Sequence, residues 1–128
     1  MSIGNTPGLT TPGKSSFEWF GVMPQEGDKE IIKKHYNAFT DTNLNKFFRG
    51  RGIKTLVLIG AYTSRCVAST ALVASDVLGY NVFIVKDLVG VPRKYKSEPK
   101  GILSALDSIL AYVVQSIDVK NAWASYTT

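Results

Sequence analysis

A continuous apolar run at residues 55–60 restricts the fold of this 128-residue chain more than any other feature. The run is rich in aliphatic residues and ends in glycine, which is typical of a strand buried on both faces. Over residues 66–78 the apolar positions recur at the spacing of one helix face, and Gly79 follows where helices commonly end. Residues 81–85 form a second apolar run. Strand, helix and strand in succession predict a βαβ unit, hence an α/β fold with a parallel sheet.

Further elements are expected on both sides of this unit. They are a strand at 30–34, a short helix after the capping residues 40–42, a helix that starts at 97–99 and keeps its apolar face to Val113, and an edge strand at 112–115. The tail beyond Lys120 shows no assignable pattern. Residues 1–26 are expected to form an arm that is mobile or lies on the surface, and residues 27–128 to form the α/β domain.

The arm contains a phosphate-loop pattern that we do not interpret as a nucleotide site. Residues 8–15 match G-x-x-x-x-G-K-S, but such a loop works only between a buried strand and the start of a helix. No apolar run precedes it, and Pro12 removes one of the backbone N–H groups that would hold phosphate. We therefore predict no nucleotide cofactor.

Composition excludes several other classes of function. No apolar run is long enough to span a membrane, and the first residues show no export signal, so a cytoplasmic protein is expected. One cysteine and one histidine are too few for a Cys/His zinc site, so no metal is predicted. The net charge of +5 is dispersed and densest between Lys86 and Lys100, which favours a solvated basic loop over nucleic-acid binding.

The single cysteine, Cys66, is the candidate reactive group. It is expected in the first turn of a helix that follows a buried strand, at the sheet edge where α/β proteins place their ligands. Backbone N–H groups and the helix dipole favour a thiolate there, and a cation from Lys33 or Lys34 would act in the same direction. The alternative is that Cys66 is an inert, buried packing residue.

Four segments resemble the isochorismatase-like cysteine hydrolases, a family that includes nicotinamidases and N-carbamoylsarcosine amidohydrolases. They are G-D-x-x-I-I-K-x-x-Y-x-A-F at 27–39, R-G-I-K-T-L-V-L-I-G at 51–60, A-Y-T-S-R-C-V-x-x-T-A at 61–71, and G-Y-x-V and the residues after it at 79–87. The resemblance covers roughly residues 27–119, and the order and spacing of the segments make it specific. It implies a three-layer, Rossmann-like fold with a mostly parallel sheet.

The resemblance also implies roles for individual residues. Cys66 would be the nucleophile that attacks a small amide or related substrate, and Lys33 would be the catalytic lysine. The peptide bond between Ala61 and Tyr62 would be cis, so that the N–H groups of Tyr62 and Cys66 could form an oxyanion hole. Tyr62, Tyr36 and Phe39 would line the substrate pocket.

The chain departs from the family pattern before residue 27. The family's acid/base aspartate lies on a first strand that has no counterpart here, and the resemblance therefore implies a sheet that lacks its first strands. Either the strands at 30–34 and 55–60 pair directly, or a second chain fills the gap. An open apolar edge favours association, so a homo-oligomer is expected, with Phe17, Trp19 and Phe20 at the interface. The alternative function is a catalytically inactive binding or assembly module.

Overall fold

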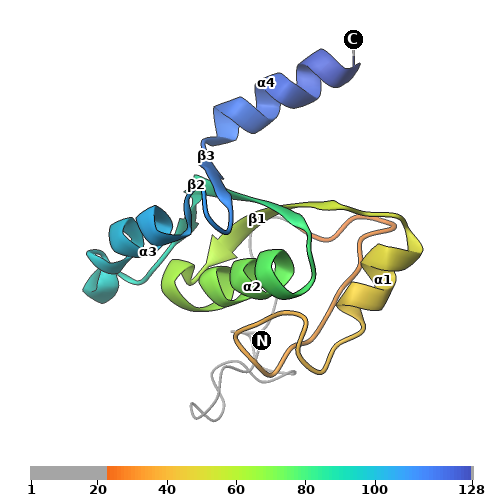
Figure 1. Ribbon diagram of the computed structural model, residues 1–128, viewed down its shortest axis with the longest axis horizontal. Helices are drawn as coiled ribbons and strands as arrows, with labels where there is room; N and C mark the ends of the chain where they lie inside the picture. The colour runs from red at the N-terminus through yellow and green to blue at the C-terminus, as the bar shows by residue number, and fades with distance from the viewer. Residues whose placement is uncertain (1–22, 128) are drawn as a thin grey trace.

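The computed structural model of the chain describes residues 23–127 (Figure 1). Its elements are, in chain order, helix α1 (Leu44–Gly50), strand β1 (Thr55–Ala61), a helical segment made of η2 (Thr63–Val67), α2 (Ala68–Leu72) and η3 (Val73–Val77), strand β2 (Asn81–Gly90), a 3-10 turn η4 (Arg93–Tyr95), helix α3 (Glu98–Leu106), strand β3 (Tyr112–Val114) and helix α4 (Ser116–Thr127). The phosphate-loop pattern at 8–15 and the aromatic residues Phe17, Trp19 and Phe20 lie outside the described residues.

The three strands form one parallel sheet in the order β1-β2-β3. Thr55 pairs with Asn81 at the start of β1 and β2, and Phe83 pairs with Tyr112 on β3. The expected α/β fold with its strand–helix–strand unit is confirmed, and so is the edge strand near residue 112.

The helical segment after β1 starts at Thr63, three residues before Cys66, because the carbonyl of Tyr62 accepts hydrogen bonds from the N–H groups of Arg65 and Val67. The segment has π-helical turns at both ends and a short α-helix between them. It ends at Gly79, whose φ of +71° is a left-handed conformation that glycine adopts without steric cost.

The apolar core of residues 23–127 lies between the sheet and the helices on one of its faces. Leu56, Val82 and Ile84 point from the strands toward this core. The helical segment contributes Ala71 and Ala74, small residues that allow close packing against the sheet. Residues of α1 and α3 pack against the same cluster, so α1, α3 and the helical segment form one layer on the same face of the sheet (Figure 1).

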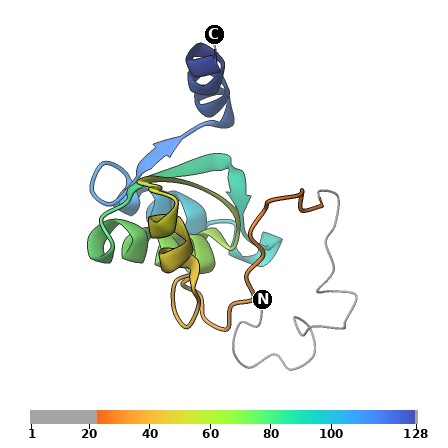
Figure 2. The ribbon, with the colours of Figure 1, turned by 90° about the vertical axis from the view of Figure 1, so that its right-hand side faces the viewer.

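The opposite face of the sheet has no covering helix among residues 23–127. Val57 and Ile59 of β1 are 49% and 61% exposed there. Helix α4 starts directly after β3 but stands apart from the rest of the protein (Figures 1 and 2). The sheet and the helices on one face therefore provide two of the three layers that the family fold implies.

The prediction of a strand at residues 30–34 is wrong. No strand of the described chain pairs with the free edge of β1, and the segment stays irregular. It is held instead by local contacts, because the Lys33 Nζ donates hydrogen bonds to the carbonyl oxygens of His35 and Tyr36. Direct pairing of this segment with β1, one of the two ways to close the sheet, does not occur.

Two further expectations differ from the structure near the C-terminus. Helix α3 ends at Leu106 instead of continuing toward Val113. Asp107 takes an extended conformation and Ser108 a positive φ of 62°, which turns the chain into β3. The tail that had no pattern forms α4. None of the helices in the described part of the chain is long and apolar enough to cross a bilayer.

Candidate active site

A hollow of about 240 Å³ lies at the carboxyl end of β1, beside the start of the following helix. Its lining comes from three separate segments: Lys33 and Ala38, then residues 58–61 of β1, then Cys66, Val67 and Thr70. Lys33 and Cys66, the two catalytic residues that the family resemblance implies, therefore border the same hollow.

The carboxyl end of β1 is shaped by an irregular register. Leu58 pairs with Ile84, but Gly60 pairs with Val89, so β2 has extra residues opposite this part of β1. Gly60 has a φ of +112°, a conformation that residues with a Cβ rarely adopt. The distortion opens the end of the sheet next to the helix, where residues 58–61 line the hollow.

Cys66 lies in the first helical turn, as predicted, and is only 6% exposed. The turn before it contains the Ala61–Tyr62 peptide bond, which is cis in this structure. Within the same turn, the Thr63 side chain is fully buried and its Oγ1 has no hydrogen-bond partner among the described residues. The thiol is thus placed in a mostly apolar wall, with access through the hollow.

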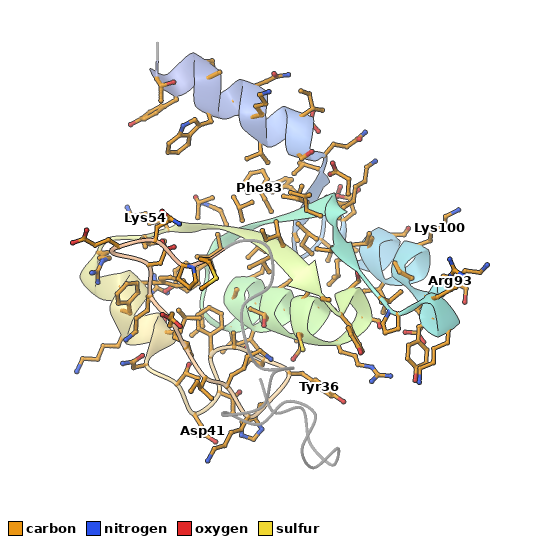
Figure 3. The ribbon with its side chains drawn as sticks, turned by 180° about the vertical axis from the view of Figure 1, so that it is seen from behind. Tyr36, Asp41, Lys54, Phe83, Arg93 and Lys100 are labelled. Carbon is orange, nitrogen blue, oxygen red and sulfur yellow. The ribbon has the colours of Figure 1, made fainter. Side chains whose placement is uncertain are left out.

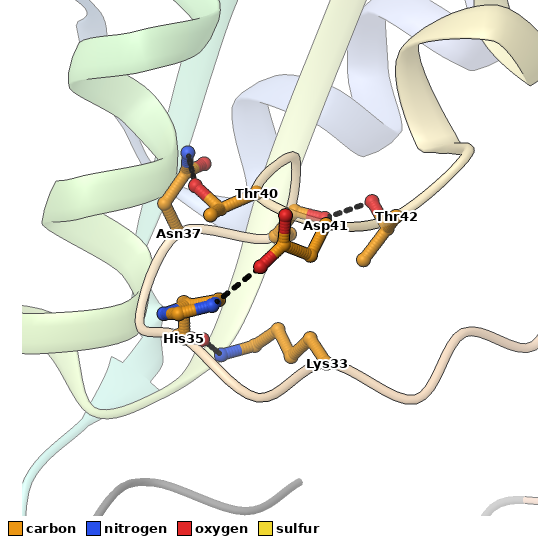
Figure 4. Close-up of polar contacts among 7 residues, drawn as sticks. Lys33, His35, Asn37, Thr40, Asp41 and Thr42 are labelled. Atoms are coloured by element: carbon orange, nitrogen blue, oxygen red, sulfur yellow. Dashed lines mark hydrogen bonds and ion pairs between the residues drawn. The ribbon is translucent and has the colours of Figure 1, made fainter.

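Lys33 reaches the hollow from an irregular segment that is braced at several points (Figure 4). Its Nζ donates to the His35 carbonyl oxygen at 2.7 Å and to the Tyr36 carbonyl oxygen at 2.9 Å. The His35 Nε2 lies 2.9 Å from Asp41 Oδ2, which closes the loop that follows. An ammonium group has three N–H donors, and these two bonds use two of them.

A hydrogen bond fixes this segment against the helix that carries Cys66. The backbone N–H of Ala38 donates to Thr70 Oγ1 at 3.0 Å, one helical turn beyond Cys66. Sequence reasoning missed the role of Thr70. The available signal was a threonine four residues after Cys66, on the same side of the helix, because a hydroxyl that becomes buried there requires a hydrogen-bond partner.

The three residues expected in the substrate pocket occupy different places. Phe39 stacks on Tyr80, with ring centroids 6.0 Å apart, and packs beside the core. The ring of Tyr62 lies 5.7 Å from the Arg65 guanidinium. Tyr36 borders a second hollow on the other side of the Tyr62–Cys66 turn, together with Arg65.

This second hollow, about 390 Å³, has an apolar floor between α2 and α3 and a charged rim. The Arg65 guanidinium lies 5.0 Å from the Tyr95 ring centroid, and its pKa is raised, chiefly by a hydrogen bond with Tyr95. The pKa of Tyr95 is lowered, first by a hydrogen bond with Lys94 and then by the one with Arg65. Arg93 and Lys100 lie nearby at this end of the molecule (Figure 3).

The residues lining the Cys66 hollow include no aspartate or glutamate. Likewise, no group of three His, Cys, Asp or Glu side chains in the described part of the chain is arranged to hold a metal ion. The side chains that border this hollow can therefore offer a thiol, an ammonium group and a hydroxyl, but no carboxylate base.

Comparison with known proteins identifies relatives of this chain. The isochorismatase domain family matches residues 4–115, a match that begins within the segment expected to be an arm. A secreted isochorismatase effector of Verticillium dahliae is 35% identical over 83 residues, which are 64% of this chain and 43% of that protein. The chain thus spans less than half the length of this relative.

Solved structures agree with this match. A hydrolase of the isochorismatase family from Chromobacterium violaceum superimposes with a TM-score of 0.85 and 26% identity, over 97% of this chain and 69% of that one. An N-carbamoylsarcosine amidase from Thermoplasma acidophilum gives a TM-score of 0.63 and 31% identity, over 73% and 51% of the two chains. The family match over most of the sequence and the shared α/β fold agree, and the chain belongs to the isochorismatase family.

Proposed function

We propose that this chain carries the nucleophile of a cysteine hydrolase that acts on a small amide or related acyl substrate. The observation that carries the proposal is the shared hollow, in which Cys66 and Lys33 meet the carboxyl end of β1. A family relative named as an N-carbamoylsarcosine amidase supports an amide as the substrate class.

In the proposed reaction the Cys66 thiolate attacks the acyl carbon, and the negative charge moves to the carbonyl oxygen. The N–H groups of Tyr62 and Cys66 would receive that charge, and Lys33 would stabilise the thiolate before attack. The base that takes the proton from the Cys66 thiol delivers it to the leaving nitrogen, so that the carbon–nitrogen bond breaks, the amine leaves, and a thioester remains. Water then cleaves the thioester, which releases the acid and restores the thiol.

The reaction also needs a carboxylate base, and the described residues that line the hollow include no aspartate or glutamate. The proposed hydrolase therefore takes its carboxylate base from outside residues 23–127, which can be the first 22 residues of this chain, another part of a longer protein, or a second chain. Efficient acyl transfer by a thiol depends on such a base.

The proposal is tested by labelling Cys66 with iodoacetamide at neutral pH and following the mass of the intact chain. The label is unambiguous because the chain has one cysteine. We expect faster labelling than for a small free thiol, and slower labelling in Lys33→Ala. Lys34→Ala is the matched control, because Lys34 is exposed and does not line the hollow. Equal rates in all three proteins would contradict the proposed role of Lys33.

A second candidate function is an inactive module that serves binding or assembly. Two observations on residues 23–127 favour it: the Cys66 hollow is lined by no carboxylate, and no strand pairs with the free edge of β1. Release of ammonia from a panel of small primary amides separates the two functions. A hydrolase turns over at least one of them and loses this activity in Cys66→Ser, whereas an assembly module shows no turnover with any.

A further inference from the structure

Two apolar surfaces have no covering element among residues 23–127. The first, which we call the open sheet face, consists of Val57, Ile59, Phe83 and Tyr112. Val57 pairs with Phe83 and Phe83 with Tyr112, so these three residues form a row across all three strands. Phe83 and Tyr112 stack with ring centroids 5.1 Å apart, and Tyr112 is still 56% exposed. Contiguous exposed apolar surface of this kind marks an interaction site.

The second surface lies on α4. Val119, Ala122, Trp123 and Tyr126 follow the spacing i, i+3, i+4, i+7 and so share one side of the helix, which we call the α4 stripe. Trp123 and Tyr126 are 70% and 85% exposed. No residue of α4 is buried. A helix in a protein is stabilised mainly by packing of its apolar side chains, and the two large aromatic residues of the α4 stripe are the side chains of α4 that gain most from a surface to pack on.

Hydrogen bonds at its first turn hold α4 away from its own sheet. Only Gln115 separates β3 from α4. The Asp87 carboxylate on β2 accepts the backbone N–H of Ser116 at 2.8 Å and also its hydroxyl. Asp118 accepts the N–H of Gln115 at 2.9 Å. These bonds fix the direction in which α4 leaves the sheet, and Figures 1 and 2 show the helix standing off the body.

We propose that two copies of this chain associate by exchanging α4, so that the α4 stripe of each copy packs on the open sheet face of the other. Both surfaces are on the same chain, which is the condition for a symmetric interface in which every contact is made twice. The exchange covers both apolar surfaces without changing the bonds at Asp87.

The surface area that the exchange would bury matches the area buried in a stable dimer. Trp123 and Tyr126 together would bury roughly 300–500 Å² per helix, and the sheet face beneath them would lose a similar area. Over both helices and both faces the total is about 1,200–2,000 Å², the usual size of a specific interface.

This interface differs from the one expected at Phe17, Trp19 and Phe20, which lie outside the described residues. It also rests on other observations than the proposed hydrolase does, because neither surface contains Cys66 or Lys33; Ile59 is the member of the open sheet face that also borders the Cys66 hollow. Failure of the labelling experiment would leave the exchange unaffected, and failure of the exchange would leave the labelling unaffected.

The first test is the molar mass in solution, measured by light scattering after gel filtration. We expect twice the 14.0 kDa of one chain for the wild type, and a mass halved to that of one chain in Ile59→Glu and in Trp123→Glu. Trp19→Ala is the matched control and is expected to keep the doubled mass. A wild-type mass of one chain, or a doubled mass that only Trp19→Ala abolishes, would overturn the proposal.

The second test does not depend on disrupting either surface. In a Cys66→Ala background, chains with Ile59→Cys are mixed with chains with Trp123→Cys and treated with a short bismaleimide. We expect a product that contains one chain of each kind. A chain that carries both Ile59→Cys and Trp123→Cys tests the alternative, in which α4 packs on the sheet of its own chain. A cross-linked product with the mass of a single chain would show that α4 folds onto its own sheet, and it would overturn the exchange, as would the absence of any cross-link.

Discussion

Thr70 ties the lysine segment to the cysteine helix, because its Oγ1 accepts a hydrogen bond from the backbone N–H of Ala38 at 3.0 Å. Ala38 and Lys33 border the hollow from one side, and Cys66 and Thr70 border it from the other. This bond closes the hollow at its base and sets the position of Lys33 relative to the thiol.

Thr70→Val is therefore expected to lower the free energy of unfolding by about 1–2 kcal/mol, because the part-buried N–H of Ala38 loses its acceptor. The same change is expected to slow alkylation of Cys66, as Lys33→Ala does. Urea denaturation and intact-mass labelling measure the two effects. Thr63→Val is the control: the Thr63 hydroxyl is buried without a partner among the described residues, so its removal is expected to be neutral or stabilising. Equal losses in both variants would contradict the assigned role of Thr70.

Gly79→Ala is expected to destabilise the protein by about 1–2 kcal/mol. A Cβ at this position meets no atom within 4 Å, so the whole cost comes from the φ of +71°. Gly101→Ala is the matched control, since Gly101 lies inside α3, also has open space around it, and has no left-handed φ. That variant is expected to be more stable than the wild type by about 0.5–1 kcal/mol. The midpoints of urea denaturation measure both, and a Gly79→Ala variant as stable as Gly101→Ala would be inconsistent with a conformational requirement at residue 79.

Acid is expected to release the start of α4. Hydrogen bonds from Ser116 lower the pKa of Asp87, so the ionised carboxylate is favoured in the folded state. The stabilisation is then complete above the ordinary aspartate pKa of about 3.9 and is lost as pH falls through the lower folded value. Hydrogen exchange of the α4 amides should therefore accelerate below about pH 4 beyond the intrinsic trend. In Asp87→Asn it should already be fast at neutral pH and show no such step. A step that persists in Asp87→Asn would assign the effect to another group.

Tyr80→Phe is expected to lower stability by about 0.5–1.5 kcal/mol. The Tyr80 hydroxyl donates to Asn45 Oδ1 at 2.7 Å and so joins α1 to the loop before β2. Phenylalanine keeps the ring against Phe39 and beneath the Arg49 guanidinium, so the substitution isolates the hydroxyl. Tyr36→Phe serves as the control, because that side chain is 43% exposed, and it is expected to leave the urea midpoint unchanged. No difference between the two variants would mean that the bond to Asn45 adds nothing to stability.

The elements predicted correctly are those whose signal is local. The run at 55–60 is apolar throughout and needs no partner to be identified, and β1 covers it. Gly79 ends the helical segment as its position predicts. The short helix expected after residues 40–42 begins at Leu44 and ends at Gly50, as its glycine indicates, but its N-cap is Asn43, which makes no side-chain capping hydrogen bond.

The errors occurred where the outcome depends on a distant neighbour. Residues 30–34 have the composition of a strand, but a strand needs a ladder partner, and none is available to them in the described chain. The apolar periodicity that extends to Val113 predicted a longer helix, and it could not show that Ser108 would adopt a positive φ just after the end of α3. Lys33 and Cys66 were found through a motif, whereas Thr70 and Arg65 became visible only when the fold brought their partners Ala38 and Tyr95 beside them.

The turn from Tyr62 to Cys66 is a wall shared by two hollows. Cys66 faces the one at the end of β1, and its chain neighbour Arg65 faces the one between α2 and α3. Arg65 and Cys66 are adjacent in the chain, so a shift of the backbone at Arg65 also shifts Cys66, because closely packed segments transmit strain. Any engineering that enlarges the Arg65 side will therefore displace the thiol as well, and the two hollows will have to be redesigned together.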